Sequence, residues 1–105
     1  MFKELDPVLH SQVRLAVMSV LIGVKTAEFS YLLQATKTTK GNLSFQLNKL
    51  LEAGYIEIRK TQKGNYPLTI CRITDKGIAA LKLTLILFQN TFGFPGMLVN
   101  KEAIL

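Results

Sequence analysis

The sequence is poor in the residues that most often carry chemistry or cross-links. It contains one cysteine, Cys71, one histidine, His10, and no tryptophan among its 105 residues. A single cysteine excludes an internal disulfide, and Cys71 with His10 is too small a ligand set for zinc. We therefore expect no metal and no cofactor, and we expect Cys71 to behave as a small buried hydrophobe.

Side-chain constellations typical of enzymes are missing as well. His10 has no nucleophile beside it, the acidic residues form no paired-carboxylate arrangement, and no glycine-rich phosphate loop is present. The sequence therefore predicts a protein that is not an enzyme. We expect His10 to lie on a helix surface or at an interface.

Long apolar runs are also absent. The longest run extends from Leu83 to Phe88 and is interrupted by Thr84, which is far too short to span a bilayer. The N-terminus lacks the pattern of a signal peptide. We therefore expect a cytoplasmic protein that makes no contact with membranes.

The composition favours a single folded domain. A hydrophobic content of 49% with 19% charged residues argues against disorder, and 105 residues fit one domain. We expect a core over about residues 5–74, a C-terminal helix over about 75–92 and a tail over 93–105. A chain this short buries only a modest share of its surface, so a partner chain would add stability.

Acidic residues are scarce, and the excess of positive charge is local. The chain has 13 Lys and Arg against 7 Asp and Glu, for a net charge of +6. Residues 37–63 hold six of the basic residues and only two glutamates, so this segment carries +4 of the net charge. Such a concentration of positive charge favours a polyanionic partner over a uniformly solvated basic surface.

A helix is predicted in the middle of this basic segment, over residues 38–53. Leucines recur at helical spacing and form an inward stripe, with one more leucine beside them: Leu43, Leu47, Leu50 and Leu51. Thr39 or Thr38 can cap the first turn through its hydroxyl, and Gly54 can adopt the left-handed conformation just past the end. Both boundaries of this helix are therefore encoded locally.

The opposite side of the same helix is polar or cationic apart from one ring. Asn42 and Gln46 can offer paired donors and acceptors to base edges, and Phe45 can contact a thymine methyl group or pack against neighbouring elements. Lys40 and Lys49 suit phosphate or guanine, and Gly41 permits close approach of the backbone. The alternative for Phe45 is packing against the hairpin or the preceding helix.

A hairpin is predicted directly after this helix. Residues 55–61 alternate apolar and polar side chains, residues 63–67 form the turn, and residues 68–74 return. We expect four side chains to face the core: Ile56, Ile58, Cys71 and Ile73. This register leaves Leu68 and Ile70 partly exposed.

Cations concentrate near the tip of the hairpin. We expect the turn region to carry four residues that can grip phosphates or a minor groove: Arg59, Lys60, Lys63 and Asn65. A plainly solvated turn is the alternative. A helix followed at once by a basic hairpin is typical of a winged helix.

Three segments at characteristic spacing strengthen this interpretation. They are LDPVLHSQVRL at 5–15, GNLSFQLNKLLEAGYI at 41–56 and RITDKG at 72–77. Over about residues 5–90 the chain resembles the small winged-helix transcriptional regulators related to the MarR and ArsR groups. The resemblance implies an α+β, mainly α, winged helix-turn-helix fold with a two-stranded wing. It also implies DNA contacts from the same helix face, although a small or polar residue often stands where Phe45 does.

Two helices are expected before residue 37. Asp6 caps the first, whose first position is Pro7 and which extends to about Ile22. Thr26 caps the second, which extends to about Ala35 and forms a helix-turn-helix pair with the helix at 38–53.

The last helix, about residues 75–91, is capped by Thr74 and is apolar nearly all round. One stripe suits its own domain: Ile78, Leu81, Leu85 and Phe88. A second stripe has no partner in so short a chain: Ala79, Leu83, Ile86 and Leu87. We expect the second stripe to form a homodimer, with the first helix joining the interface. The alternative is that it cradles the tail, Met97 to Leu105.

These expectations combine into one functional prediction: a homodimeric regulator that binds specific sequences of double-stranded DNA. The helix at 38–53 lies in the major groove, and the wing at 59–67 lies on the backbone or minor groove. The DNA-binding residues of the helix are Thr38, Thr39, Lys40, Gly41, Asn42, Phe45, Gln46 and Lys49. A winged helix that only binds proteins is the alternative, because a fold does not dictate a function.

Overall fold

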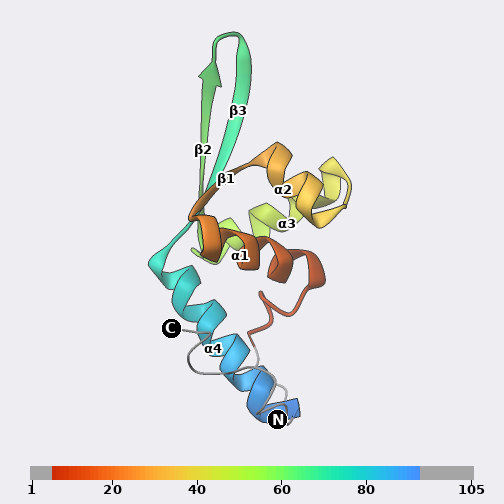
Figure 1. The fold of residues 1–105 in the computed structure, drawn as a ribbon, viewed down its shortest axis with the longest axis vertical. Coiled ribbons are helices and arrows are strands. Elements are labelled where there is room, and N and C mark those ends of the chain that lie inside the picture. Colours follow the sequence, from red (N-terminus) through yellow and green to blue (C-terminus); the bar gives the residue numbers. More distant parts are fainter. Residues whose placement is uncertain (1–5, 93–105) are drawn as a thin grey trace.

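The computed structural model describes residues 6–92, with side chains as far as residue 87 (Figure 1). The predicted tail, 93–105, and the side chain of Phe88 lie outside the described residues. In chain order the elements are α1 (Gln12–Val24), β1 (Thr26–Glu28), α2 (Phe29–Thr36), α3 (Lys40–Glu52), β2 (Ile56–Lys63), β3 (Tyr66–Ile73) and α4 (Asp75–Phe92). The predicted winged-helix fold, mainly helical, is confirmed.

The strands form one small antiparallel sheet in the order β1-β3-β2. β2 and β3 pair over their whole length, from Ile56 opposite Ile73 to Lys63 opposite Tyr66, and their outer part projects from the body as the wing (Figure 1). β1 pairs only with the inner end of β3. The wing is therefore two-stranded, as predicted, but its base is three-stranded.

The core lies where α1, α2 and α3 pack together against the inner end of the sheet. The fully or almost fully buried side chains of the predicted stripe and strands are Leu43, Leu47, Leu50, Ile56, Cys71 and Ile73. Leu51, predicted beside this stripe, is exposed instead, because it lies about 80° around α3 from the centre of the buried face. Ile58, Leu68 and Ile70 are half-buried.

The predicted start of the first helix is wrong. Pro7 lies in a turn, because the Asp6 carboxylate accepts a hydrogen bond from the backbone N–H of Val8 at 2.9 Å and another from the Tyr55 hydroxyl. α1 begins only after Ser11, whose hydroxyl accepts from a first-turn N–H. Asp6 therefore fastens the segment before α1 to the rest of the fold.

The predicted cap of the second helix is also wrong. Thr26 is in strand β1, where it lies opposite Arg72, and Glu28 lies opposite Ile70. α2 therefore begins at Phe29, with Glu28 at the cap position and no side-chain hydrogen bond there. Thr26–Glu28 pair with the edge of β3 that β2 does not cover. The backbone hydrogen bonds of this pairing outweigh the local capping preference of threonine.

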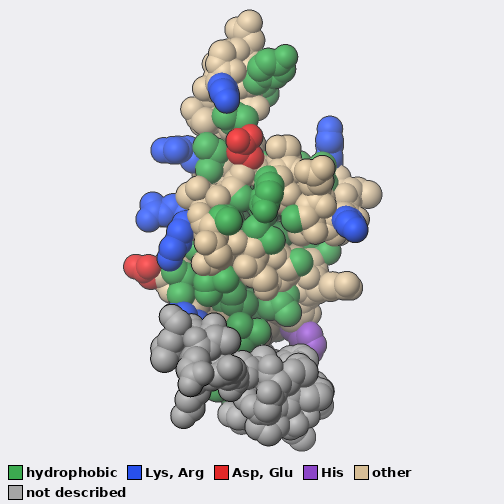
Figure 2. All heavy atoms as spheres, viewed as in Figure 1, with side chains coloured by type: hydrophobic (Ala, Val, Ile, Leu, Met, Phe, Trp, Pro, Cys, Tyr) green, Lys and Arg blue, Asp and Glu red, His purple; other side chains and the backbone are tan. Residues whose placement is uncertain are grey.

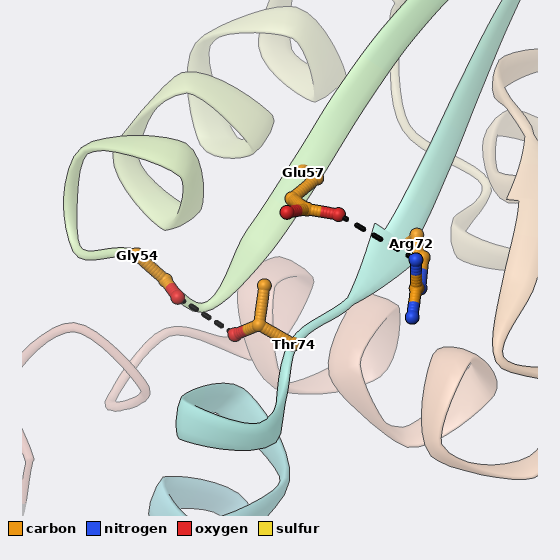
Figure 3. Close-up of polar contacts among 4 residues, drawn as sticks. All are labelled: Gly54, Glu57, Arg72 and Thr74. Carbon is orange, nitrogen blue, oxygen red and sulfur yellow. Dashed lines mark hydrogen bonds and ion pairs between the residues drawn. The ribbon is translucent and has the colours of Figure 1, made fainter.

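The beginning of α4 is fastened to the end of α3. Gly54 follows α3 with φ of +80°, as predicted. The Thr74 hydroxyl donates to the Gly54 carbonyl at 2.7 Å (Figure 3) and accepts from the Gly77 N–H at 3.0 Å, which confirms the predicted cap. The Thr74 N–H donates to the Tyr55 carbonyl at 3.0 Å. These bonds fix the direction in which α4 leaves the body.

α4 leaves the body on the side away from the wing (Figure 1). Among its residues as far as 87, the buried ones are Gly77, Leu81 and Thr84, which lie on one face of the helix. Leu85, predicted to face the core, is 44% exposed, because the buried face is rotated toward Thr84 and leaves Leu85 at its margin. The predicted inward stripe is therefore only partly correct.

Candidate nucleic-acid interface

The outward face of α3 is polar, cationic and aromatic. Its three buried leucines anchor the opposite face, so Lys40, Gly41 and Lys49 are exposed. The Phe45 ring is 55% exposed, and Lys49 Nζ lies 5.2 Å from the ring centroid. An exposed fraction this large disfavours the alternative that Phe45 packs against the hairpin or α2.

The first turn of α3 is capped as predicted. The Thr39 hydroxyl accepts a hydrogen bond from the Asn42 N–H at 3.1 Å. The N–H groups of Lys40 and Gly41 lie at the same end of the helix, where the helix dipole favours negative charge. This end of α3 therefore favours a negatively charged group.

The two amides predicted to read bases are engaged inside the protein. Arg14 Nη1 donates to Gln46 Oε1 at 2.6 Å, and Gln46 Nε2 donates to Asn42 Oδ1 at 3.0 Å. Asn42 Nδ2 then donates to Thr38 Oγ1 at 2.7 Å. We call these four side chains the α3 ladder. It runs along the flank of α3 that faces α1, and both amides are half-buried.

The set of residues predicted from the sequence omitted two that lie on this surface and one on α1 that contacts it. Ser44 and Asn48 are exposed on α3. Their positions on a helical wheel, away from the leucine stripe, were sufficient to find them. Arg14 is 32 positions from Gln46 in the sequence, so no local pattern could reveal that contact.

All four predicted wing residues are exposed, but they do not share a face. Because side chains alternate across a strand, Arg59 and Lys63 lie on one side of the wing and Lys60 on the other. Arg59 lies opposite Ile70, which also pairs with β1, so the prediction that Arg59 is carried toward the tip is wrong. Asn65 lies in the turn.

Positively charged side chains extend from the wing to the body of the domain. Figure 2 shows Lys and Arg side chains on the wing and along the edge below it. Arg72 Nη1 lies 3.9 Å from Glu57 Oε1 at the base (Figure 3), a pair so exposed that it contributes about 0–1 kcal/mol. Within residues 6–87, neither Arg59 nor Lys60 nor Lys63 forms an ion pair. Their charges are therefore available to a phosphate backbone.

The outer face of α4 carries exposed apolar side chains, with exposed Lys82 beside them. Leu83 is 56% exposed and Ile86 54%, Ala79 is exposed, and Leu87 is half-buried. These are the residues of the predicted second stripe. They lie at the opposite end of the molecule from the wing (Figure 1).

Two groups, the buried Cys71 thiol and the half-buried Tyr55 phenol, have a raised pKa. Burial raises the pKa of the Cys71 thiol to about 11. Burial, helped by the hydrogen bond to Asp6 and its negative charge, raises the pKa of Tyr55 to about 12.

Over residues 6–92 no cluster of three His, Cys, Asp or Glu side chains could hold a metal ion. Nor does any helix in that part of the chain have the length and apolarity to cross a membrane.

Comparison with known proteins places this geometry among DNA-binding folds. The profile of a family described as "winged helix DNA-binding domain" matches residues 13–89. An uncharacterized protein of Methanocaldococcus jannaschii is 37% identical over 75 residues, which is 71% of this chain and 82% of that protein.

Two solved structures have closely similar folds. A transcriptional regulator homologue from Pyrococcus horikoshii is 27% identical, with a TM-score of 0.76 over 88% of this chain and 89% of that chain. A transcriptional regulator of the MarR family from Enterococcus faecalis is 19% identical, with a TM-score of 0.71 over 93% of this chain and 84% of that chain.

Proposed function

This chain belongs to the winged helix DNA-binding domain family, and we propose that it is a homodimeric transcriptional regulator that binds specific sequences of double-stranded DNA. The family and the fold are those of DNA-binding regulators, which agrees with the resemblance to small winged-helix regulators. One observation carries the proposal: α3 presents exposed cationic, polar and aromatic side chains beside a basic wing, on a helix anchored by buried leucines.

In the proposed complex α3 lies in the major groove, which is wide enough for a helix. The exposed Phe45 ring suits contact with a thymine methyl group, and Lys40 and Lys49 suit phosphate or guanine. A Cβ atom at Gly41 would have no neighbour within 4 Å, so DNA can approach the backbone closely there. Exposed Ser44 and Asn48 add donors and acceptors to the same surface.

The wing supplies binding affinity that does not depend on the DNA sequence. Lys63 lies at the tip and Lys60 lies three positions below it on the opposite side of the wing, so they suit the two walls of a minor groove or phosphates on either side. Asn65 in the turn suits a phosphate or a sugar contact, and Arg59 suits phosphates closer to α3.

The dimer is proposed to form through α4. The exposed face at Ala79, Leu83 and Ile86 is apolar, and a two-fold axis would bury it against the same face of a second chain. Two-fold pairing would set two α3 helices about 34 Å apart, one turn of DNA, so the preferred site should be a near-palindrome.

Selection of bound duplexes from random DNA tests the proposal. We expect enrichment of a near-palindrome, and an affinity for it that exceeds the affinity for a scrambled duplex of equal composition. Phe45→Ala should reduce this preference with little effect on folding, because the ring is 55% exposed. Tyr31→Ala is the matched control, since that ring on α2 is 53% exposed and lies outside the α3 surface.

The alternative, a winged helix that only binds proteins, gives different results. It would yield no enriched sequence, and retention on heparin would be weak and insensitive to salt. A DNA-binding protein with this basic surface should instead be retained on heparin and released as salt rises, because binding of phosphates releases counterions.

A further inference from the structure

We infer that Arg14 is a positioning residue for sequence recognition: it sets the orientation of the Gln46 and Asn42 amides on α3 and thereby the bases that they accept. The inference rests on the proposed function, since it assumes that α3 reads the major groove. Arg14 lies on α1, and its role is exerted through the α3 ladder rather than by contact with DNA.

Arg14 is itself held from two sides. Its Nε donates to the Val8 carbonyl at 2.6 Å, while Nη1 donates to Gln46 Oε1 at 2.6 Å. Val8 belongs to the turn that Asp6 fastens to Tyr55. The guanidinium plane is therefore fixed by the fold before any ligand arrives.

The chemistry of arginine allows only one orientation of the amide groups in the α3 ladder. A guanidinium has only donors, so the group that Gln46 turns toward Arg14 must be its carbonyl oxygen. The Gln46 nitrogen must then face Asn42, which presents its own oxygen to it and its nitrogen to Thr38. Turning either amide over would set one N–H against another. Arg14 thus removes the twofold ambiguity that an amide side chain otherwise has.

The fixed orientation of the two amides determines which of their hydrogen-bonding groups remain for DNA. After the ladder bonds, the nitrogen of each amide keeps one N–H to donate and its oxygen keeps one lone pair, while the Thr38 hydroxyl keeps its proton. These donors suit the acceptors of the major groove, which are purine N7, guanine O6 and thymine O4. Without Arg14 each amide could present its oxygen instead and accept from adenine or cytosine amino groups, so discrimination would fall.

Arg14 is poorly placed to act as a phosphate contact. It is half-buried, and its Nε and Nη1 each donate to a protein oxygen. Loss of Arg14 should therefore change sequence preference while leaving the sequence-independent affinity and its salt dependence unaltered. That separation distinguishes a positioning residue from a DNA-binding cation.

The test compares Arg14→Met, which keeps the apolar stem, with Arg14→Lys and with Arg72→Met as a matched loss of an exposed arginine. For each protein the dissociation constants for the selected and the scrambled duplex give a preference ratio. We expect Arg14→Met to lower this ratio by about tenfold, the value of a charge-assisted hydrogen bond. Arg14→Lys keeps a donor and should retain most of the preference, and Arg72→Met should retain all of it.

A measurement on the wild-type protein alone supports the same test if Arg14→Met does not fold. In the free protein, the side-chain N–H protons of Gln46 should exchange with solvent more slowly than those of Asn48, which is exposed on the same helix. Equal exchange at Gln46 and Asn48 would mean that the ladder does not form in solution and would overturn the inference.

Three other outcomes of the binding measurements would overturn either the positioning role of Arg14 or the proposed function. A folded Arg14→Met protein with the wild-type preference ratio overturns the positioning role. An equal loss on both duplexes, with a shallower dependence on salt, makes Arg14 a phosphate contact and also overturns it. A wild-type protein with no preference between duplexes instead contradicts the proposed function, and the inference that rests on it fails for that separate reason.

Discussion

Gly77 is the position where the fold tolerates a side chain least. A Cβ atom there would overlap the carbonyl oxygen of Tyr55 and would lie 3.0 Å from Met18 Cε. The methionine can move, but the Tyr55 carbonyl belongs to the backbone and accepts a bond from Thr74. The Gly77→Ala substitution therefore has to push the first turn of α4 away by about 1 Å to restore ordinary contact distances.

The expected loss follows from opposing contributions. Alanine gains about 1 kcal/mol over glycine within a helix. Forcing the turn outward costs about 1–3 kcal/mol as overpacking, and weakening the two bonds from Thr74 to Gly54 and Tyr55 costs about 1 kcal/mol each. The net prediction is that Gly77→Ala lowers the free energy of unfolding by about 2–4 kcal/mol.

Urea unfolding followed by circular dichroism, at one fixed protein concentration, measures this loss. Gly23→Ala is the matched control, because Gly23 lies in α1 and a Cβ there would have no neighbour within 4 Å. The control should gain stability by up to about 1 kcal/mol. A Gly77→Ala protein as stable as the wild type would refute the close contact between α4 and the end of α3.

Three further predictions concern the wing, the dimer and the ionisation of Tyr55. Replacing Lys60 and Lys63 with alanine should weaken binding to all duplexes alike and make the slope of log affinity against log salt shallower by about one unit per lost phosphate contact; an unchanged slope removes the wing from the interface. Changing Leu83 and Ile86 to glutamate should convert a dimer into a monomer by light scattering, and a variant that stays dimeric contradicts pairing through α4. Because the pKa of Tyr55 is raised to about 12 in the folded state, the unfolded chain loses the phenol proton first above pH 10, so stability falls as pH rises from about 10 to about 12. Tyr55→Phe should lack this component, and an identical pH dependence in both proteins would show that the phenol is not perturbed.

Local signals in the sequence were sufficient for α3 and the wing. The Thr39 cap, the buried leucines and Gly54 define α3 by interactions within a few residues, and the structure places them as predicted, with Leu51 alone of the four leucines exposed. Alternation fixed the inward residues of the hairpin for the same reason. Such features depend on the chain immediately around them and can be recognised without knowledge of the fold.

The errors arose where a distant partner outweighs a local preference. Asp6 looks like a helix cap, but its carboxylate is held by Tyr55, 49 positions away. Thr26 also looks like a cap, but the free edge of β3 draws it into a strand. The local sequence around Asp6 does not reveal Tyr55 as its partner, and the local sequence around Thr26 does not reveal the edge of β3.

The candidate site shows the same limit. Periodicity correctly placed Asn42 and Gln46 away from the leucine stripe, but it could not show that Arg14 on α1 engages them. It also treated α4 as two separate stripes, whereas contact with the body selects a face rotated toward Thr84 and leaves Leu85 exposed. The angular orientation of a helix depends on packing, which a single sequence does not specify.

The central claim is that the outward face of α3 lies in the major groove, and a single cysteine on that face tests it most directly. Cys71 is fully buried with a pKa raised to about 11, so the wild-type protein should resist labelling and serves as the control. Asn48→Cys places a reactive thiol on exposed α3, to which an iron chelate that generates hydroxyl radicals can be attached. On a selected duplex we expect cleavage of both half-sites, offset toward the 5′ side on the two strands, as radicals released in the major groove produce. Cleavage offset toward the 3′ side, which marks the minor groove, or no localised cleavage at all, would contradict it.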